Sequence, residues 1–388
     1  MRPRPTRRRG TLTATAATLV AFCAVQTLSA AATASAAPDR AATPAAHSRS
    51  VTKAAVTSAQ DRAARDIARS LGDSSWKARL RTAALKSAEV SVADQASGAL
   101  KTRLAAADRD IAEAKGLNAA KTGSLLQLRL GDASMRASLS AGEEPWVAAA
   151  VSDDDLTTVT AYDSAGQAHV LDAKTPPSHP VYVVDVDGTK ALAAGLDVMR
   201  QELVKAGVES AAPQTVTSTP SAAAAAGFWT TKITSVHLNN DEEPWIKGKA
   251  EIYTLVSGFG QDGKVRVDPV DMPYLDYDGT TYRPNQILVN WSYYKYNLAD
   301  AVMMEEDGST NYRDLAKAIA GILITILDGG AYIPLVNAIL DAIPDDWWTD
   351  DPDYVDSWYT LAQANKGTYT GARGNGTMTV EPYFVSQL

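Results

Sequence analysis

The densest group of side chains able to do chemistry lies between residues 341 and 356. Seven aspartates fall within these 16 residues, and Trp347 and Trp348 stand among them. Carboxylates this close in sequence repel one another unless water or a cation separates them, whereas tryptophan side chains favour burial. A calcium ion would satisfy both demands, because it takes roughly six to eight oxygen ligands from carboxylates and carbonyls. The alternative is an acidic loop that water alone solvates.

A second acidic loop, residues 239–243, precedes a predicted strand and could converge on the first loop. We therefore predict a calcium site between the two loops. Its candidate ligands are Asp241, Glu243, Asp346, Asp350, Asp351 and Asp353. Calcium is the one cofactor that the sequence suggests.

Two further acidic groups are weaker candidates. Asp185 and Asp187 end a predicted strand, where a ligand site can form, although a turn and a helix cap are the better explanation. Residues 305–308, with the sequence Glu-Glu-Asp-Gly, are predicted to form a turn.

The sequence carries no recognisable catalytic motif. Metalloprotease, nucleophile-elbow, phosphate-loop and dinucleotide-binding patterns are all missing, and His169, His179 and His237 are isolated from one another. One catalytic chemistry stays open, in which a pair of carboxylates hydrolyses a glycosidic bond. The aromatic residues that could then stack on sugar rings are Trp347, Trp348 and Trp358.

Charge is distributed unevenly along the chain. The formal net charge is −8, and residues 229–388 contain 23 Asp and Glu against 11 Lys and Arg. Nucleic-acid binding needs a basic surface, so this balance argues against it. Divalent cations, basic partners and sugars remain compatible with such a chain.

The first 37 residues have the pattern of a secretory signal peptide. Five arginines precede an apolar stretch at 11–30, and Ala34-Ser35-Ala36 forms a cleavage site. Removing this leader also removes Cys23, the only cysteine. We expect a secreted, extracellular protein whose mature chain has no transmembrane segment and no thiol.

Composition divides the rest of the chain into four segments. Residues 38–57 are rich in Ala, Ser, Thr and Pro without periodicity, which predicts a disordered mature N-terminus. Residues 58–207 are predicted to form a domain of helices followed by a small α/β unit. Residues 208–227 contain five consecutive alanines and are predicted to be a linker. Residues 228–388 are predicted to form an acidic, aromatic-rich β domain.

Hydrophobic periodicity predicts the elements of both domains. In the first, helices fill residues 58–115, and a further helix at 190–206 follows strands at 146–151, 157–162, 169–172 and 181–188. In the second, strands are predicted at 231–238, 250–257, 264–269, 286–293, 354–361 and 377–384, with a helical hairpin inserted at about 311–343. The predicted fold class is α+β, and the second domain is expected to be a mainly antiparallel, β-sandwich-like domain.

Several segments together resemble a group of secreted bacterial proteins classed as a domain of unknown function, number 3103. They are Glu144–Val147, Tyr162–Gly166, His169–Asp172, Pro180–Val184 and Glu243–Tyr253. The Ala- and Arg-rich leader is similar to those of high-GC actinobacteria. The resemblance implies an N-terminal α/β part and a C-terminal β-rich part, and it implies no activity.

These observations favour a secreted, non-catalytic binding protein with calcium in the acidic loops of its C-terminal domain. Its partner would be an extracellular protein, a surface or a polysaccharide. The alternative is a secreted hydrolase that acts on glycans through paired carboxylates. A third hypothesis is a zymogen-like protein in which residues 38–207 mask the C-terminal domain.

Overall fold

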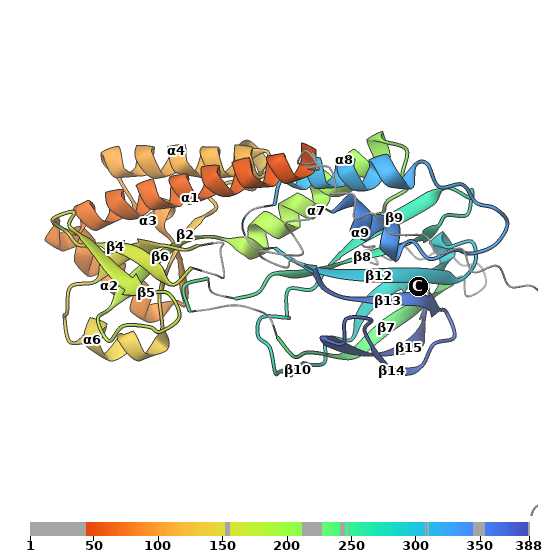
Figure 1. The fold of residues 1–388 in the computed structure, drawn as a ribbon. Coiled ribbons are helices and arrows are strands. Elements are labelled where there is room, and N and C mark those ends of the chain that lie inside the picture. Colours follow the sequence, from red (N-terminus) through yellow and green to blue (C-terminus); the bar gives the residue numbers. More distant parts are fainter. Residues whose placement is uncertain are drawn as a thin grey trace, which may run out of the picture. The chain divides into compact units, whose positions relative to one another are not determined.

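Figure 1 shows the fold in a computed structural model. The structure describes residues 44–151, 156–211, 227–240, 245–247, 249–306, 308, 310–343 and 354–386. Contacts divide the chain into residues 1–41 and a second compact unit, 42–388, which holds every described residue. The predicted leader and residues 212–226 of the predicted linker lie outside the described residues.

Helices dominate the start of the described chain. They are α1 (Pro44–Ser70), α2 (Ser74–Lys86), α3 (Val92–Gln95) and α4 (Gly98–Ala114). Helices α1 and α4 run side by side (Figure 1). Alanines on the buried side of α1 allow this close approach, and Ile67 of the same helix is fully buried.

The predicted disorder of residues 38–57 is corrected for residues 44–57, which belong to α1. Val56 is buried, and the Thr52 hydroxyl donates a hydrogen bond to the Ala114 carbonyl at 3.3 Å. Alanine has the highest helix propensity of all residues, and packing against α4 stabilises a helix that composition alone does not reveal.

A six-stranded sheet follows these helices. Its strands stand in the order β1-β2-β6-β3-β4-β5, and they are β1 (Glu89–Ser91), β2 (Leu126–Leu130), β3 (Trp146–Ala149), β4 (Thr158–Tyr162), β5 (Ala168–Asp172) and β6 (Val181–Val186). Strands β3 and β6 pair in parallel, whereas the other neighbours pair antiparallel. Short helices α5 (Ala119–Thr122) and α6 (Arg136–Ser140) connect strands, and α7 (Gly188–Lys205) follows β6. The predicted strands and helix of this unit are confirmed.

The second half contains two antiparallel sheets. One has the order β13-β12-β8-β9, formed by β8 (Ile252–Phe259), β9 (Val265–Asp271), β12 (Leu298–Glu305) and β13 (Tyr354–Ala362). The other has the order β10-β7-β15-β14, with β11 also paired to β7. Its strands are β7 (Gly227–Leu238), β10 (Thr281–Tyr282), β11 (Gln286–Asn290), β14 (Gly367–Thr370) and β15 (Gly376–Ser386).

Two helices interrupt these strands, as predicted. They are α8 (Tyr312–Leu323) and α9 (Val336–Ala342). The Asn311 side chain caps α8 by accepting a hydrogen bond from the Asp314 N–H at 3.2 Å. Helix α8 packs against α7, where Gly195 leaves room for the Tyr312 ring. No helix among the described residues has the length and apolar character needed to cross a membrane.

Three hydrophobic clusters hold these layers together. The largest includes residues of both halves, such as Leu104, Leu196, Val302 and Leu323. A second lies between the two antiparallel sheets, and a third covers the other face of the six-stranded sheet, where it includes Ile246. The predicted α+β class is confirmed, and elements from both halves position the site described next.

Candidate functional site

The six predicted calcium ligands lie outside the described residues. They are Asp241, Glu243, Asp346, Asp350, Asp351 and Asp353. The same holds for Trp347 and Trp348. Among the described residues, no group of three or more His, Cys, Asp and Glu side chains could hold a metal ion. The calcium site therefore stays a prediction.

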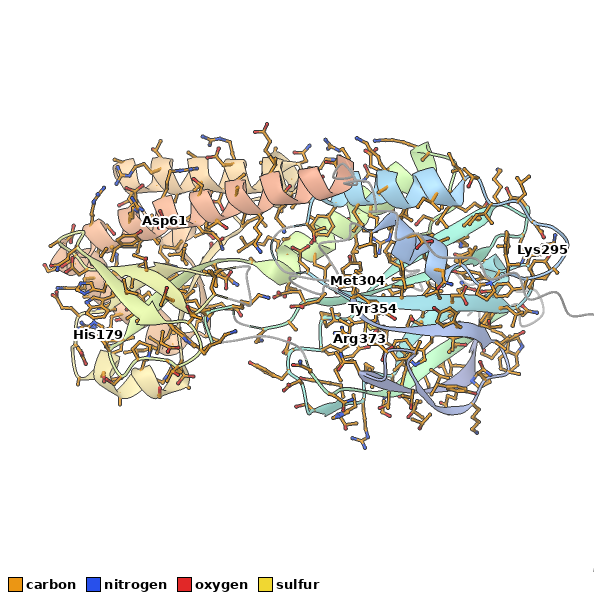
Figure 2. The ribbon with its side chains drawn as sticks, viewed as in Figure 1. Asp61, His179, Lys295, Met304, Tyr354 and Arg373 are labelled. Carbon is orange, nitrogen blue, oxygen red and sulfur yellow. The ribbon has the colours of Figure 1, made fainter. Side chains whose placement is uncertain are left out.

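Asp356, the last acid of the run, is described and has a structural role. Its side chain is fully buried. One oxygen accepts hydrogen bonds from the N–H groups of Ser357 (2.8 Å) and Arg373 (2.7 Å), and the other from Gly376 (2.7 Å). Arg373 also donates to the Tyr354 carbonyl, and the two side chains lie close together in Figure 2. This carboxylate fixes the turn between β14 and β15.

Two of the three sequence-isolated histidines meet in space on a tryptophan. The Trp146 ring lies 4.0 Å from the ring of His169 and 3.9 Å from that of His179, which Figure 2 labels. Each imidazole contacts a carboxylate, Asp163 at 3.1 Å and Glu143 at 2.7 Å. Hydrogen bonds from His169 and from backbone N–H groups hold the pKa of Asp163 below its ordinary value. The third, His237, contacts the Thr280 carbonyl instead.

The strongest candidate site is a charged cleft at the carboxyl ends of β3 and β6. The parallel ladder continues past β3, where the Ala150 N–H donates to the Val184 carbonyl at 2.9 Å. Both strands therefore end side by side, and β6 ends with Asp185 and Val186 before α7 begins. In α/β sheets, ligands bind in the crevice outside the carboxyl ends of parallel strands.

The cleft has an outer and an inner part. The volume of the outer part is ≈ 420 Å³, and that of the inner part is ≈ 40 Å³. Five residues line both parts: Asp185, Val186, Lys247, Lys249 and Glu251. The first two come from β6, and the other three from the segment that leads into β8. The two halves of the chain thus build this cleft together.

Arg129 of β2 connects the two walls of the cleft, because it hydrogen-bonds to β6 on one side and to residues 245–246 on the other. Its guanidinium donates to Asp185 at 3.3 Å, to the Trp245 carbonyl at 3.0 Å and to the Ile246 carbonyl at 2.6 Å. Only arginine presents donors in a fork wide enough to span these acceptors. Gly131 leaves room for the Trp245 ring, since a Cβ there would lie 2.6 Å from it.

Glu251 lies against the first turn of α7. A Cβ on Gly188 would be 2.3 Å from the Glu251 carboxyl carbon, so only glycine leaves room for this carboxylate. The Asp187 side chain caps the same helix by accepting from the Lys190 N–H at 2.9 Å. A helix N-terminus favours negative charge. Two carboxylates already supply it here, so this terminus is not a free site for a phosphate.

Two lysines contribute positive charge to the cleft besides Arg129 and Arg136. Burial opposes the charge of Lys249, but the carboxylates of Asp276 and Glu89 outweigh this effect and hold the Lys249 pKa above its ordinary value. Lys249 Nζ lies 3.4 Å from Asp276. Lys247 is 9% exposed and lines both parts of the cleft.

The inner part ends at a buried ion pair. Lys115 Nζ lies 2.5 Å from Glu306 Oε1, and the two side chains are 0% and 2% exposed. The Gly308 N–H also donates to Oε1, at 2.8 Å. Burial, together with the neighbouring Glu306 carboxylate, raises the pKa of the Tyr312 hydroxyl well above its ordinary value.

A second groove, of ≈ 500 Å³, lies between β9 and β11 and has a mainly apolar lining that includes Pro269, Ile287 and Leu288. Strand β9 is the last strand of its sheet, but the part of β9 that lines this groove is poorly suited to pair with a strand from another chain. Pro269 has no N–H, and its carbonyl already accepts from Arg200 at 2.8 Å.

Comparison with known protein families places the outer part of the cleft within one family. The family model described as "Protein of unknown function (DUF3103)" matches residues 58–388. The chain belongs to the DUF3103 family. The DUF3103 match covers every residue that lines the outer cleft. No curated protein and no solved structure gives a significant match.

Sequence reasoning found part of this cleft. It noted Asp185 at the end of a strand, and it assigned Asp187 as a helix cap, which the structure confirms. It missed Lys115 and Glu251 and interpreted Glu306 only as part of a turn, because these residues lie far apart in the chain and only the fold brings them together. The one local signal was the alternation of charges at 247, 249 and 251 just before a buried strand.

Proposed function

We propose that this protein is a secreted, non-catalytic binding protein and that its ligand occupies the charged cleft. The observation that carries this proposal is the convergence of Lys247, Lys249 and Glu251 from one half with Asp185 and Arg129 from the other. The outer volume of ≈ 420 Å³ lies within the range of about 300–1,000 Å³ that small-molecule sites occupy.

The charges of the cleft suggest the class of ligand. Its basic side chains are Arg129, Arg136, Lys247 and Lys249, and its acidic ones are Glu89, Asp132, Asp185 and Glu251. A ligand with a single charge would meet groups of its own sign in this cleft as well as groups of the opposite sign. A short peptide with a free ammonium and a free carboxylate complements both sets, and Trp245 and Tyr277 add apolar contact. We therefore propose a zwitterionic short peptide as the ligand.

Binding of the dipeptide Ala-Ala tests this proposal. Isothermal titration is expected to give saturable binding, whereas N-acetyl-Ala-Ala-amide, which has no end charges, is expected to bind at least tenfold more weakly. Lys247→Gln and Glu251→Gln should each weaken binding of Ala-Ala. Lys264→Gln, at a side chain that is 67% exposed and paired with Asp262, is the matched control and should bind like the wild type.

Unchanged binding by both cleft variants would refute the cleft as the binding site. Equal binding by the blocked dipeptide would refute recognition of the two end charges. Absence of binding by any dipeptide would refute the ligand class.

The alternative function is glycan hydrolysis in the same cleft. Trp245 and Tyr277 line it together with the carboxylates of Asp185 and Glu251, and aromatic rings beside paired carboxylates are what glycosidases use. Release of reducing sugar from a panel of extracellular polysaccharides, lost in Glu251→Gln, would favour this alternative over the binding protein.

Calcium forms a separate element of the proposal. The acidic loops at 239–243 and 341–356 would hold it, and their role would be to order a partner-binding surface of the C-terminal half. The support is the density of aspartates in the sequence beside two tryptophans.

A further inference from the structure

Lys115 and Glu306 form a contact that joins the two halves of the chain at its interior. Lys115 follows α4 and Glu306 follows β12, and 191 positions separate them. Both side chains are buried, at 0% and 2% exposure, and Nζ lies 2.5 Å from Oε1. The Tyr312 ring lies beside them, with its centre 5.5 Å from Nζ.

Full burial is costly for two charges. Desolvation costs several kcal/mol for each ion, and attraction within the pair offsets this cost only when hydrogen bonds satisfy the remaining lone pairs and protons. The environment therefore favours any change that removes both charges at once.

The two oxygens of the Glu306 carboxylate differ in their surroundings. Oε1 accepts from both Lys115 and the Gly308 N–H, the latter at 2.8 Å. Oε2 is buried and has no hydrogen-bond partner among the residues that the structure describes. The inner cavity of ≈ 40 Å³, lined by Lys115, Glu306 and Gly308, is large enough for a water molecule.

We propose that Lys115 and Glu306 condense to an amide, which links the two halves covalently. A proton first passes from Nζ to the carboxylate, which gives a neutral amine and a neutral acid. Nζ then attacks the carboxyl carbon, the new C–N bond forms, and the bond from that carbon to Oε2 breaks. Oε2 leaves as water with the two protons that Nζ loses.

This step balances without any further reagent. The ammonium and carboxylate together carry no net charge, and neither does the amide with its water. No atom changes its oxidation state, so the step needs no oxidant or reductant. Well-oriented intramolecular reactions reach effective concentrations of about 10⁵–10⁸ M, and the contact between Nζ and the Glu306 carboxylate supplies the proximity on which such rates depend. The Gly308 N–H stabilises the negative charge that develops on Oε1 during attack.

The new bond would link the two halves of the chain covalently, a role that disulfide bonds play in exported proteins. The sequence has a single cysteine, Cys23, which lies in the predicted leader. An amide between Lys115 and Glu306 instead closes a loop that contains β2 to β12 and removes a buried ion pair.

Mass spectrometry of the purified chain tests the proposal. Once the N-terminal peptide has fixed the start of the chain, the wild type is expected to be lighter than its sequence by one water molecule. Tryptic digestion should yield a branched peptide that joins the Lys115 and Glu306 segments. Lys115→Met should have the full mass of its sequence. Glu306→Gln, which keeps the geometry, should lose one ammonia instead of one water.

The full sequence mass in the wild type would overturn the proposal, and the pair would then be an ordinary buried ion pair. So would a water loss that maps to an Asp-Gly step such as Asp278-Gly279, with no branched peptide. The wild-type measurement decides the matter even if the variants fail to fold.

Discussion

Replacement of Asp356 by asparagine tests whether this acid is a structural residue or a cation ligand. In the wild type, three backbone N–H groups donate to its buried carboxylate, from Ser357, Arg373 and Gly376. Asparagine has the same shape but only one acceptor oxygen. Its amide group would place a donor opposite the Gly376 N–H or opposite the other two.

The expected loss of stability follows from these contacts. A hydrogen bond to a charged group contributes about 1.5–3 kcal/mol, and a buried donor left without a partner costs about 1–3 kcal/mol. Asp356→Asn loses one charged bond, converts the other two to weaker neutral bonds and creates one donor–donor contact. We expect the free energy of unfolding to fall by about 3 kcal/mol.

Urea unfolding followed by tryptophan fluorescence measures this change. The midpoint should fall at an unchanged m-value. The same fall is expected in EDTA and in millimolar calcium, because both carboxylate oxygens already accept from the backbone. Asp197→Asn is the control, since that side chain is 68% exposed and forms an ion pair with Arg200 at the surface; it should cost about 0–1 kcal/mol.

A loss below about 1 kcal/mol for Asp356→Asn would contradict the buried hydrogen-bond network. A loss seen only in calcium would identify Asp356 as a metal ligand instead.

Three further predictions follow from the same structure. Gly195→Ala should lower the free energy of unfolding by about 1–3 kcal/mol, because its Cβ would lie 2.3 Å from the Tyr312 ring. Gly321→Ala, in α8 with open space around it, should instead raise the free energy of unfolding by about 0.5–1 kcal/mol, and chemical denaturation measures both changes. Hydrogen bonds from Lys295, Tyr296 and the Gly330 N–H lower the pKa of Asp328 to about 2. The stability that this carboxylate contributes is therefore present above the unfolded pKa of 3.8 and is lost as the pH falls through about 2. NMR titration of the carboxyl group should show this pKa, and Lys295→Met should raise it. Calcium should raise the melting temperature above that in EDTA, and at a hundredfold excess over Kd the rise corresponds to about 2.7 kcal/mol. The double variant Asp350→Asn/Asp351→Asn should abolish this rise. An equal rise in the double variant would place calcium elsewhere.

Sequence patterns predicted most elements whose residues alternate or repeat clearly. The buried strand β6 and the amphipathic helices α7 and α8 lie close to their predicted positions. Strand β12 was missed, although it stands between β13 and β8. Its sequence, Leu-Ala-Asp-Ala-Val-Met-Met-Glu, is rich in helix formers, and pairing on both edges overrides that local preference.

The candidate site was harder to predict than the fold. Local sequence drew attention to the acidic run at 341–356, where charges are dense. The cleft instead gathers its charges from β2, β6 and the segment before β8, so a short window contains at most the alternation at 247, 249 and 251. Lys115 and Glu306 looked like ordinary helix-end and turn residues, because burial is a property of the folded chain and not of either sequence neighbourhood.

The pairing of β7 with β15 has a consequence for how the second half of the chain is made. β15 stands between β7 and β14, and Leu238 pairs with Gly376. A growing chain therefore carries β7 without its main partner until almost the whole second half has been synthesised. An unpaired strand edge invites association with other chains, and closing such a long loop slows folding. A chaperone that binds extended segments would therefore protect this chain most between the synthesis of β7 and that of β15.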